Sequence, residues 1–195
     1  MASSGRGKRT AGKKATGTVK KKAVKKASGK KASAAKAPKK EGGAWAAVFT
    51  PRAPGERRYW LVKSEPTTFS WDDLLASKDQ TTNWNGIRNF AARNFMRDGM
   101  KLGDHVYFYH SSVIPQAIVG VAEVVREAYP EPNEPDWSQV DLRAVAPLER
   151  PVTLAELKAK SELAQMALLR IGRLSVTPVT PREWDVIRTM GEMAG

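Results

Sequence analysis

The stretch Tyr59–Pro66, YWLVKSEP, joins a buried strand to a polar end. Its first four residues are aromatic or branched apolar residues, which are typical of a strand in a protein core. Lys63, Ser64 and Glu65 follow, and Pro66 stops the strand because proline cannot donate a hydrogen bond to a sheet. Side chains alternate across a strand, so Lys63 and Glu65 face one side and Ser64 the other. We expect this strand to carry polar groups to the rim of a barrel or sheet. A solvated Lys63–Glu65 ion pair is the alternative.

Charge divides the 195-residue chain into two parts. Residues 1–40 contain fifteen of the 33 Lys and Arg residues and no Asp or Glu, whereas residues 41–195 carry 18 basic and 20 acidic residues. The net charge of +13 therefore belongs to the N-terminal part, and the remainder is close to neutral. The high isoelectric point of the whole chain thus does not indicate a basic groove in the folded part.

Residues 1–43 consist almost entirely of Lys, Ala, Ser, Gly, Thr and Arg, so they bury too little apolar surface to fold. We expect a disordered basic tail, which resembles the tails of linker histones and of some bacterial nucleoid proteins. Such a tail binds nucleic-acid phosphates without reading sequence. A solubilising segment is the alternative. The phosphate-binding candidates are Lys13, Lys14, Lys20, Lys21, Lys22, Lys25, Lys26, Lys30, Lys31, Lys39 and Lys40.

Several classes of chemistry have no support in the sequence. The chain has no cysteine, and His105 and His110 face opposite ways on a predicted strand, so we expect no metal site. Phosphate-loop, hydrolase-elbow, zincin and dinucleotide motifs are missing, and we expect no cofactor. No run of the sequence reads as a signal peptide or a membrane span. We expect a soluble, monomeric, intracellular protein, in the nucleus of a eukaryote or in the cytoplasm and nucleoid of a bacterium.

The rest of the chain predicts an α+β fold. Residues 44–58 are expected to be a linker, and residues 59–190 one domain. Predicted strands cover 59–64, 104–111, 117–125, 137–145 and 174–179, predicted helices cover 71–77, 90–97, 153–160, 162–171 and a segment from 181, and a proline-rich loop is expected at 129–135. Short strands separated by helical inserts favour a small mixed β-barrel with surrounding helices over a doubly wound sheet.

Aromatic and polar residues recur at the ends of these predicted strands. Aromatic rings stack on flat bases, while hydroxyl, amide and guanidinium groups read base edges. Trp84 lies between two asparagines in NWNGIRN, where turn chemistry carries an aromatic side chain that we expect to be exposed over a cavity. Core filling is the alternative for Trp84, and structural roles are the alternative for the others. The candidates are Lys63, Ser64, Glu65, Trp84, Arg88, Asn89, Tyr109, His110, Ser111, Arg173, Leu174 and Ser175.

The order of these motifs resembles the EVE domain family. The resemblance rests on YWLVKSEP, FSWDDL, NWNGIRNFAARNFMR, MKLGDHVYFYHSS, AIVGVAEVV and RLSV, and it runs from Tyr59 to about Ile187. It implies a PUA-like barrel related to YTH domains, and a reader of modified bases in DNA or RNA. It also implies that a flipped modified base, such as a modified cytosine or adenine, is held by the same candidate residues.

An enzyme is the competing interpretation. The related ASCH domains resemble PUA-type barrels in which Lys, Thr and Glu hydrolyse an acylated cytidine, and Lys63, Ser64 and Glu65 offer similar groups here. Because Ser64 faces away from the other two on a regular strand, we do not expect the three groups to converge. We therefore predict a non-catalytic binding module, with an amidohydrolase as the alternative.

Overall fold

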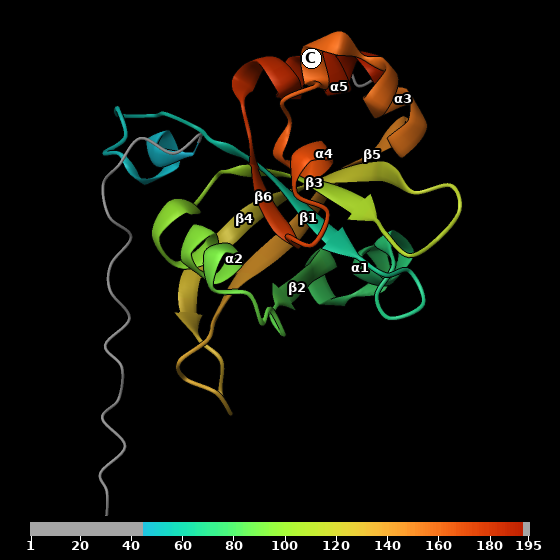
Figure 1. Ribbon diagram of the computed structural model, residues 1–195. Helices are drawn as coiled ribbons and strands as arrows, with labels where there is room; N and C mark the ends of the chain where they lie inside the picture. The colour runs from blue at the N-terminus through green and yellow to red at the C-terminus, as the bar shows by residue number, and fades with distance from the viewer. Residues whose placement is uncertain (1–44, 193–195) are drawn as a thin grey trace, which may run out of the picture. The chain divides into compact units, whose positions relative to one another are not determined.

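The computed structural model describes residues 45–192, in which six strands form one mixed sheet (Figure 1). The proposed basic tail and its lysines lie outside these residues. The strand order is β2-β5-β4-β3-β1-β6. The strands are β1 (Tyr59–Ser64), β2 (Thr81–Trp84), β3 (His105–His110), β4 (Ala117–Pro130), β5 (Ser138–Thr153) and β6 (Val176–Val179). The expected α+β class is confirmed.

The position of β1 explains why distant parts of the sequence meet at one edge. β1 pairs in parallel with β3, so that Ser64 lies opposite His110 and both strands end at the same edge of the sheet. β6 runs antiparallel to β1, with Val176 opposite Val62. The residues just before β6 therefore lie beside the end of β1, where the Lys63 amide donates to the Ser175 carbonyl at 2.9 Å.

The hairpin of β4 and β5 is longer than the sequence predicts. β4 continues to Pro130, so the loop predicted at 129–135 begins too early in the prediction. β5 continues to Thr153, so the strand predicted at 137–145 ends too early in the prediction. The register between the two strands shifts at several places, including the segment where Gly120 lies opposite Pro147. Such irregularities allow a proline inside a strand, because they interrupt the ladder that proline cannot complete.

The helical segments are short. They are η1 (Ala46–Phe49), α1 (Trp71–Ala76), η2 (Lys78–Gln80), α2 (Phe90–Asn94), the π-helical turn η3 (Phe95–Gly99), α3 (Leu154–Ala159), η4 (Ser161–Leu163), α4 (Ala167–Arg170) and α5 (Pro181–Met190). α1, α3 and α5 each begin with a capping box, formed by Ser70, Thr153 and Thr180 with an acidic residue three positions later. In the described part of the chain, no helix has the length and apolar character needed to cross a membrane.

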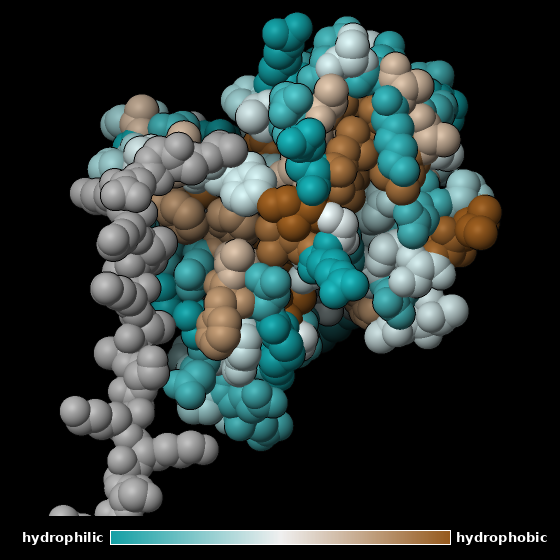
Figure 2. Space-filling model, viewed as in Figure 1, coloured by the Kyte–Doolittle hydropathy of each residue, from teal (hydrophilic) through white to brown (hydrophobic). Residues whose placement is uncertain are grey.

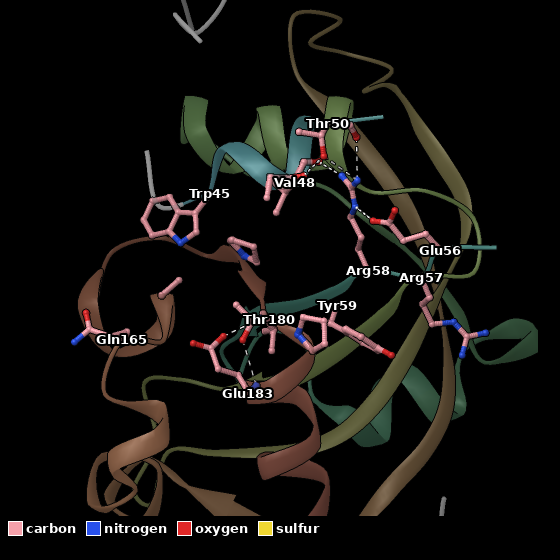
Figure 3. A pocket seen from close by; sticks show the side chains of 15 residues that line it. Trp45, Val48, Thr50, Glu56, Arg57, Arg58, Tyr59, Gln165, Thr180 and Glu183 are labelled. Carbon is pink, nitrogen blue, oxygen red and sulfur yellow. Dashed lines mark hydrogen bonds and ion pairs between the residues drawn. The ribbon is translucent and has the colours of Figure 1, made fainter. Parts of the chain in front are cut away.

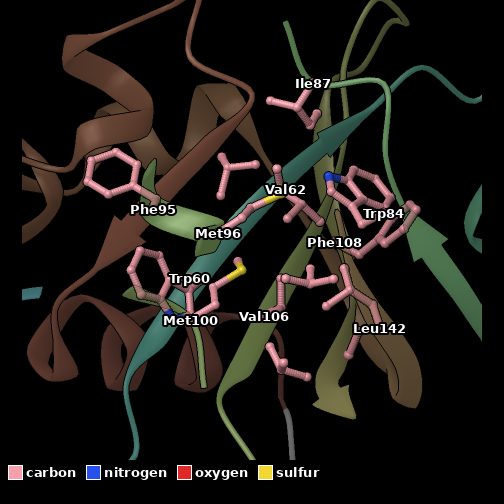
Figure 4. Close-up of a cluster of buried hydrophobic side chains, with 14 of the residues drawn as sticks. Trp60, Val62, Trp84, Ile87, Phe95, Met96, Met100, Val106, Phe108 and Leu142 are labelled. Carbon is pink, nitrogen blue, oxygen red and sulfur yellow. The ribbon is translucent and has the colours of Figure 1, made fainter. Parts of the chain in front are cut away.

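Buried side chains form one cluster on each face of the sheet. Figure 4 shows the first cluster, in which Trp60, Val62 and Phe108 from the central strands pack against Phe95 and Met96 of η3. Both edge strands contribute to this same cluster, through Trp84 of β2 and Val176 of β6. The sheet therefore curls around it, in keeping with the expected barrel-like shape. The second cluster joins the opposite face to α3, η4, α4 and α5.

The segment before β1 packs on the sheet through an ion pair. Arg52 donates to both carboxylate oxygens of Asp104, at 2.5 and 2.7 Å, and Asp104 is completely buried. The same carboxylate accepts from the indole nitrogen of Trp60 at 2.8 Å. The Phe49 ring also stacks on Phe95, with 5.6 Å between ring centroids. Residues 45–58 thus belong to the packed body of the described structure.

Candidate functional site

The polar end of β1 is fixed by hydrogen bonds to its two neighbours. The Lys63 ammonium group donates to the Gly172 carbonyl at 2.9 Å, and burial lowers the pKa of Lys63. The Ser64 hydroxyl is buried and donates to the Phe69 carbonyl. The Ser64 carbonyl accepts from the Ser111 amide at 2.7 Å and from the Ser111 hydroxyl at 3.0 Å. We call Lys63–Glu65, at this end of β1, the ridge, and hydrogen bonds hold it to the segments that flank it.

Two cavities border this ridge, and Lys63 and Glu65 line both. The first, which we call the tryptophan cavity, has a volume of about 560 Å³ and is lined by Lys63, Ser64, Glu65, Thr68, Phe69, Thr82, Asn83, Trp84, Asn85 and Ile87. The second, the serine cavity, has a volume of about 400 Å³ and is lined by Lys63, Glu65, Tyr109, Ser111, Ser112, Gln116, Leu154, Leu168, Gly172, Arg173, Leu174 and Ser175.

Trp84 forms part of the wall of the tryptophan cavity but does not expose its ring. Only 7% of the residue is accessible, and its ring packs edge-on against Phe108, with 5.6 Å between centroids. The expectation of an exposed indole is therefore wrong. The reason is that Trp84 is the last residue of β2, paired with Val140, rather than part of the turn. Its indole nitrogen is buried and has no hydrogen-bond acceptor in the described structure.

The serine cavity contains the candidates from β3 and from the segment before β6. Tyr109 is almost fully buried, donates to the Gln116 side chain at 3.1 Å, and has its pKa raised to about 12 by burial. Arg173 is exposed, Leu174 is buried and Ser175 is half-buried. With Ser111, these residues surround a cavity that has hydroxyl groups, an amide and a guanidinium group in its wall.

Three sequence candidates line neither cavity. The His110 ring nitrogen Nε2 accepts from the Trp71 amide at 3.1 Å. Asn89 caps α2 by accepting from the amides of Ala91 and Ala92 at 2.9 and 3.2 Å. Each of these contacts serves the start of a helix rather than a cavity.

Arg88, the third of these candidates, lies on the β4–β5 hairpin side of the molecule. It forms a bidentate pair with Glu131, at 3.0 and 2.9 Å, and its guanidinium lies 5.3 Å from the centroid of the Trp137 ring. Glu131 also accepts from the Gly86 amide at 2.9 Å, so the pair fixes the turn after β2. Arg88 therefore shapes the turn that follows Trp84.

Several cavity residues were not among the sequence candidates. In the tryptophan cavity they are Thr68, Phe69, Thr82, Asn83, Asn85 and Ile87, and in the serine cavity they are Ser112, Gln116, Leu154, Leu168 and Gly172. Asn83 and Asn85 flank Trp84 in the sequence, and this position could have identified them as site candidates. Leu154 and Leu168 come from helices distant in sequence, and no local pattern marks them.

A third cavity, of about 560 Å³, lies at the other end of β1 (Figure 3). Trp45 and Val48 line it from the N-terminal segment, Tyr59 from the start of β1, and Thr180 and Glu183 from the start of α5. None of the candidate residues of the sequence lines it. Most of its polar groups already have partners, since Thr180 and Glu183 form the capping box of α5.

The polar groups of the ridge are positioned but not paired for catalysis. The Lys63 ammonium and the Ser64 hydroxyl each donate to a different main-chain carbonyl, and Glu65 accepts from Ser112 at 2.9 Å. A nucleophile needs a base within hydrogen-bond distance, and these contacts direct each group elsewhere. Within residues 45–192, no three histidine or acidic side chains gather in a way that could hold a metal ion.

Comparisons with known proteins give the family. The model of the EVE domain matches residues 58–190. Human thymocyte nuclear protein 1 is 36% identical over 167 residues, which cover 69% of this chain and 74% of the human one. Among solved structures, a hypothetical protein from Leishmania major is 42% identical with a TM-score of 0.65, covering 70% of this chain and 96% of that one. Human THYN1 protein in complex with 5-methylcytosine-containing DNA is 36% identical with a TM-score of 0.65, covering 71% and 99%. This chain belongs to the EVE domain family.

Proposed function

We propose that this chain is a non-catalytic nucleic-acid-binding protein that holds a flipped, modified base in the tryptophan cavity. The volume of about 560 Å³ falls within the roughly 300–1,000 Å³ of typical small-molecule sites. Phe69 supplies an aromatic wall, and Ser64, Asn83 and Asn85 supply polar groups for the edge of a base. The ligand class is a modified cytosine or a modified adenine.

The indole N–H of Trp84 is the observation that carries this proposal. A buried donor without an acceptor costs about 1–3 kcal/mol, so each one in a folded protein calls for an explanation. Trp71 and Thr177 also hold a buried polar atom without a partner in the described structure, but of the three residues only Trp84 lines the tryptophan cavity. The Trp84 indole nitrogen is itself buried, so a ring nitrogen or carbonyl oxygen of a bound base would accept its hydrogen bond only after the indole turns toward the cavity, and binding would then remove the cost.

The human relative supports 5-methylcytosine in DNA as the first ligand to test, since its structure was solved with such DNA. The tail would add affinity of another kind. Fifteen positive charges in residues 1–40 bind phosphates without base information, whereas residues 41–195 carry two more acidic than basic residues. Because its ligand is nucleic acid, we infer an intracellular location, in the nucleus or the nucleoid according to the host.

Binding of the full chain to matched duplexes tests the proposal. The duplexes carry one 5-methylcytosine, one N6-methyladenine or no modification, and about 200 mM salt weakens the contribution of the tail. We expect about tenfold tighter binding to one modified duplex, the range that a methyl group confers in a fitted pocket. Equal affinity for all three would contradict the proposal.

The amidohydrolase alternative predicts that N4-acetylcytidine is hydrolysed. We expect instead that incubation with N4-acetylcytidine releases no acetate, because Lys63 and Ser64 donate to the Gly172 and Phe69 carbonyls rather than to each other. Release of acetate that is lost in Lys63→Met would establish the enzyme instead.

A further inference from the structure

The loop between β3 and β4 carries an unusually exposed apolar tip. Ile114 is 96% exposed, the largest value among the large hydrophobic residues of the described structure, and Val113 beside it is 38% exposed. Figure 1 shows this loop projecting from the body to the right of the view, and hydrophobic atoms project at the same place in Figure 2. Single exposed apolar residues are common, so the position of this one decides its meaning.

The loop is anchored on both sides of its tip. On one side, Ser111 donates twice to the Ser64 carbonyl, and the Ser112 hydroxyl donates to Glu65 at 2.9 Å. On the other side, the Gln116 carbonyl accepts from the Leu154 amide at 2.8 Å, and its side chain accepts from Tyr109. Ile114 therefore lies two residues from a fixed point in either direction.

These anchors place the tip at the rim of the candidate site. Ser111, Ser112 and Gln116 line the serine cavity. Glu65, which Ser112 contacts, lines both cavities. Arg173 is exposed and lines the serine cavity, where its guanidinium is available to a phosphate. Because Lys63 and Glu65 line both cavities, a duplex that delivers a base to the tryptophan cavity and also covers the serine cavity would contact this tip.

We propose that Ile114 is a wedge that fills the gap left in the base stack when the modified base is flipped out. This inference rests on the proposed function and adds a residue that acts on the duplex rather than on the base. Unstacking a base costs a few kcal/mol, and apolar side chains inserted between base steps offset such a cost in other nucleic-acid-binding proteins. A branched apolar side chain on an anchored loop suits that role.

Affinities of the full chain for duplex and single-stranded DNA test the wedge. Ile114→Ala should weaken binding to the 5-methylcytosine duplex by about tenfold or more, because the apolar contact with the stack is lost. Binding to the same modified sequence as a single strand should change by less than about twofold, since a single strand has no paired stack to open. The preference for modified over unmodified single strands should stay the same.

Leu102→Ala is the matched control. Leu102 is 62% exposed and precedes β3, at the end of the strand opposite to the loop. The Leu102→Ala variant should leave the affinities for the modified duplex and for the modified single strand unchanged. The proposed wedge is wrong if Ile114→Ala binds the modified duplex as tightly as the unmutated protein, or if it weakens binding to the duplex and to the single strand equally. Either result would leave the proposed base pocket unaffected. If the unmutated protein prefers no modified base in either form, the proposed function fails and the wedge fails with it.

Discussion

The ring nitrogen Nε2 of His110 accepts a hydrogen bond from the main-chain amide of Trp71 at 3.1 Å. This contact joins the last residue of β3 to the first residue of α1, and it requires a neutral imidazole, because a protonated ring has no acceptor. Burial lowers the pKa of His110 from its ordinary 6.5, while the nearby Asp72 opposes this effect. A residue predicted for the base pocket thus holds a helix in place.

The first prediction is a stability loss in acid that His110 causes. Because the folded pKa lies below the unfolded one, the unfolded chain binds a proton that the folded chain does not as the pH falls below about 6.5, and stability falls with it. His110→Gln keeps an acceptor but does not titrate. Urea unfolding at pH 7 and pH 5 should show a smaller loss for this variant than for the unmutated protein. Equal losses would contradict the assignment.

The second prediction concerns the buried ion pair of the N-terminal segment. Asp104→Asn leaves the Arg52 charge without its carboxylate, so it should lower the free energy of unfolding by about 3–5 kcal/mol. Asp98→Asn is the control, because its pair with Arg97 is exposed and should contribute less than about 1 kcal/mol. Denaturant unfolding of both variants measures the difference. Similar values for the two would show that residues 45–58 contribute little to stability.

The third prediction concerns the tail. If its charges bind phosphate, affinity for any long duplex should fall about a thousandfold or more between 50 and 200 mM salt. Replacing the eleven candidate lysines of the tail with glutamine should remove most of this dependence, while the preference for a modified base stays the same. An unchanged salt dependence would mean that a basic surface within residues 45–192 binds the phosphates.

The sequence was sufficient to predict the bounds of β1 and the class of fold. The four strand formers after Arg58, ended by Pro66 a few residues later, have few other interpretations, and β1 begins and ends as predicted. The helix expected at 162–171 is instead η4 and α4 with a break between them. Leu163 and Met166 are fully buried against the same cluster, and packing there outweighs the helical pattern.

The sequence predicted only part of the candidate site, because contacts between residues distant in the sequence decide which side chains meet there. Residues at strand ends converge because β1 pairs in parallel with β3, and this pairing places Lys63 beside Tyr109. Arg88 and Asn89 share a motif with Trp84 but turn away from the cavity. The partner of Arg88 is Glu131, 43 residues further along the chain, and no local pattern reveals such a contact.

Two tryptophan variants test the central claim most directly. Trp84 and Trp71 are both at least 93% buried, both pack against Phe108, and both have an indole nitrogen without an acceptor, but only Trp84 lines the tryptophan cavity. Each is changed to phenylalanine, which keeps a ring and removes the donor. Alanine is avoided, because its loss of about 3–5 kcal/mol in stability would obscure binding.

The measurement is the ratio of affinities for modified and unmodified duplexes at about 200 mM salt. One hydrogen bond contributes roughly 1 kcal/mol, and only a duplex whose base is flipped into the cavity makes it, so with the unmodified duplex bound unflipped Trp84→Phe should reduce this ratio about fivefold, while Trp71→Phe should leave it unchanged. Melting temperatures of both variants provide the folding control. A Trp84→Phe protein that keeps the full preference, or a Trp71→Phe protein that loses as much, would contradict the assignment of the base to the tryptophan cavity.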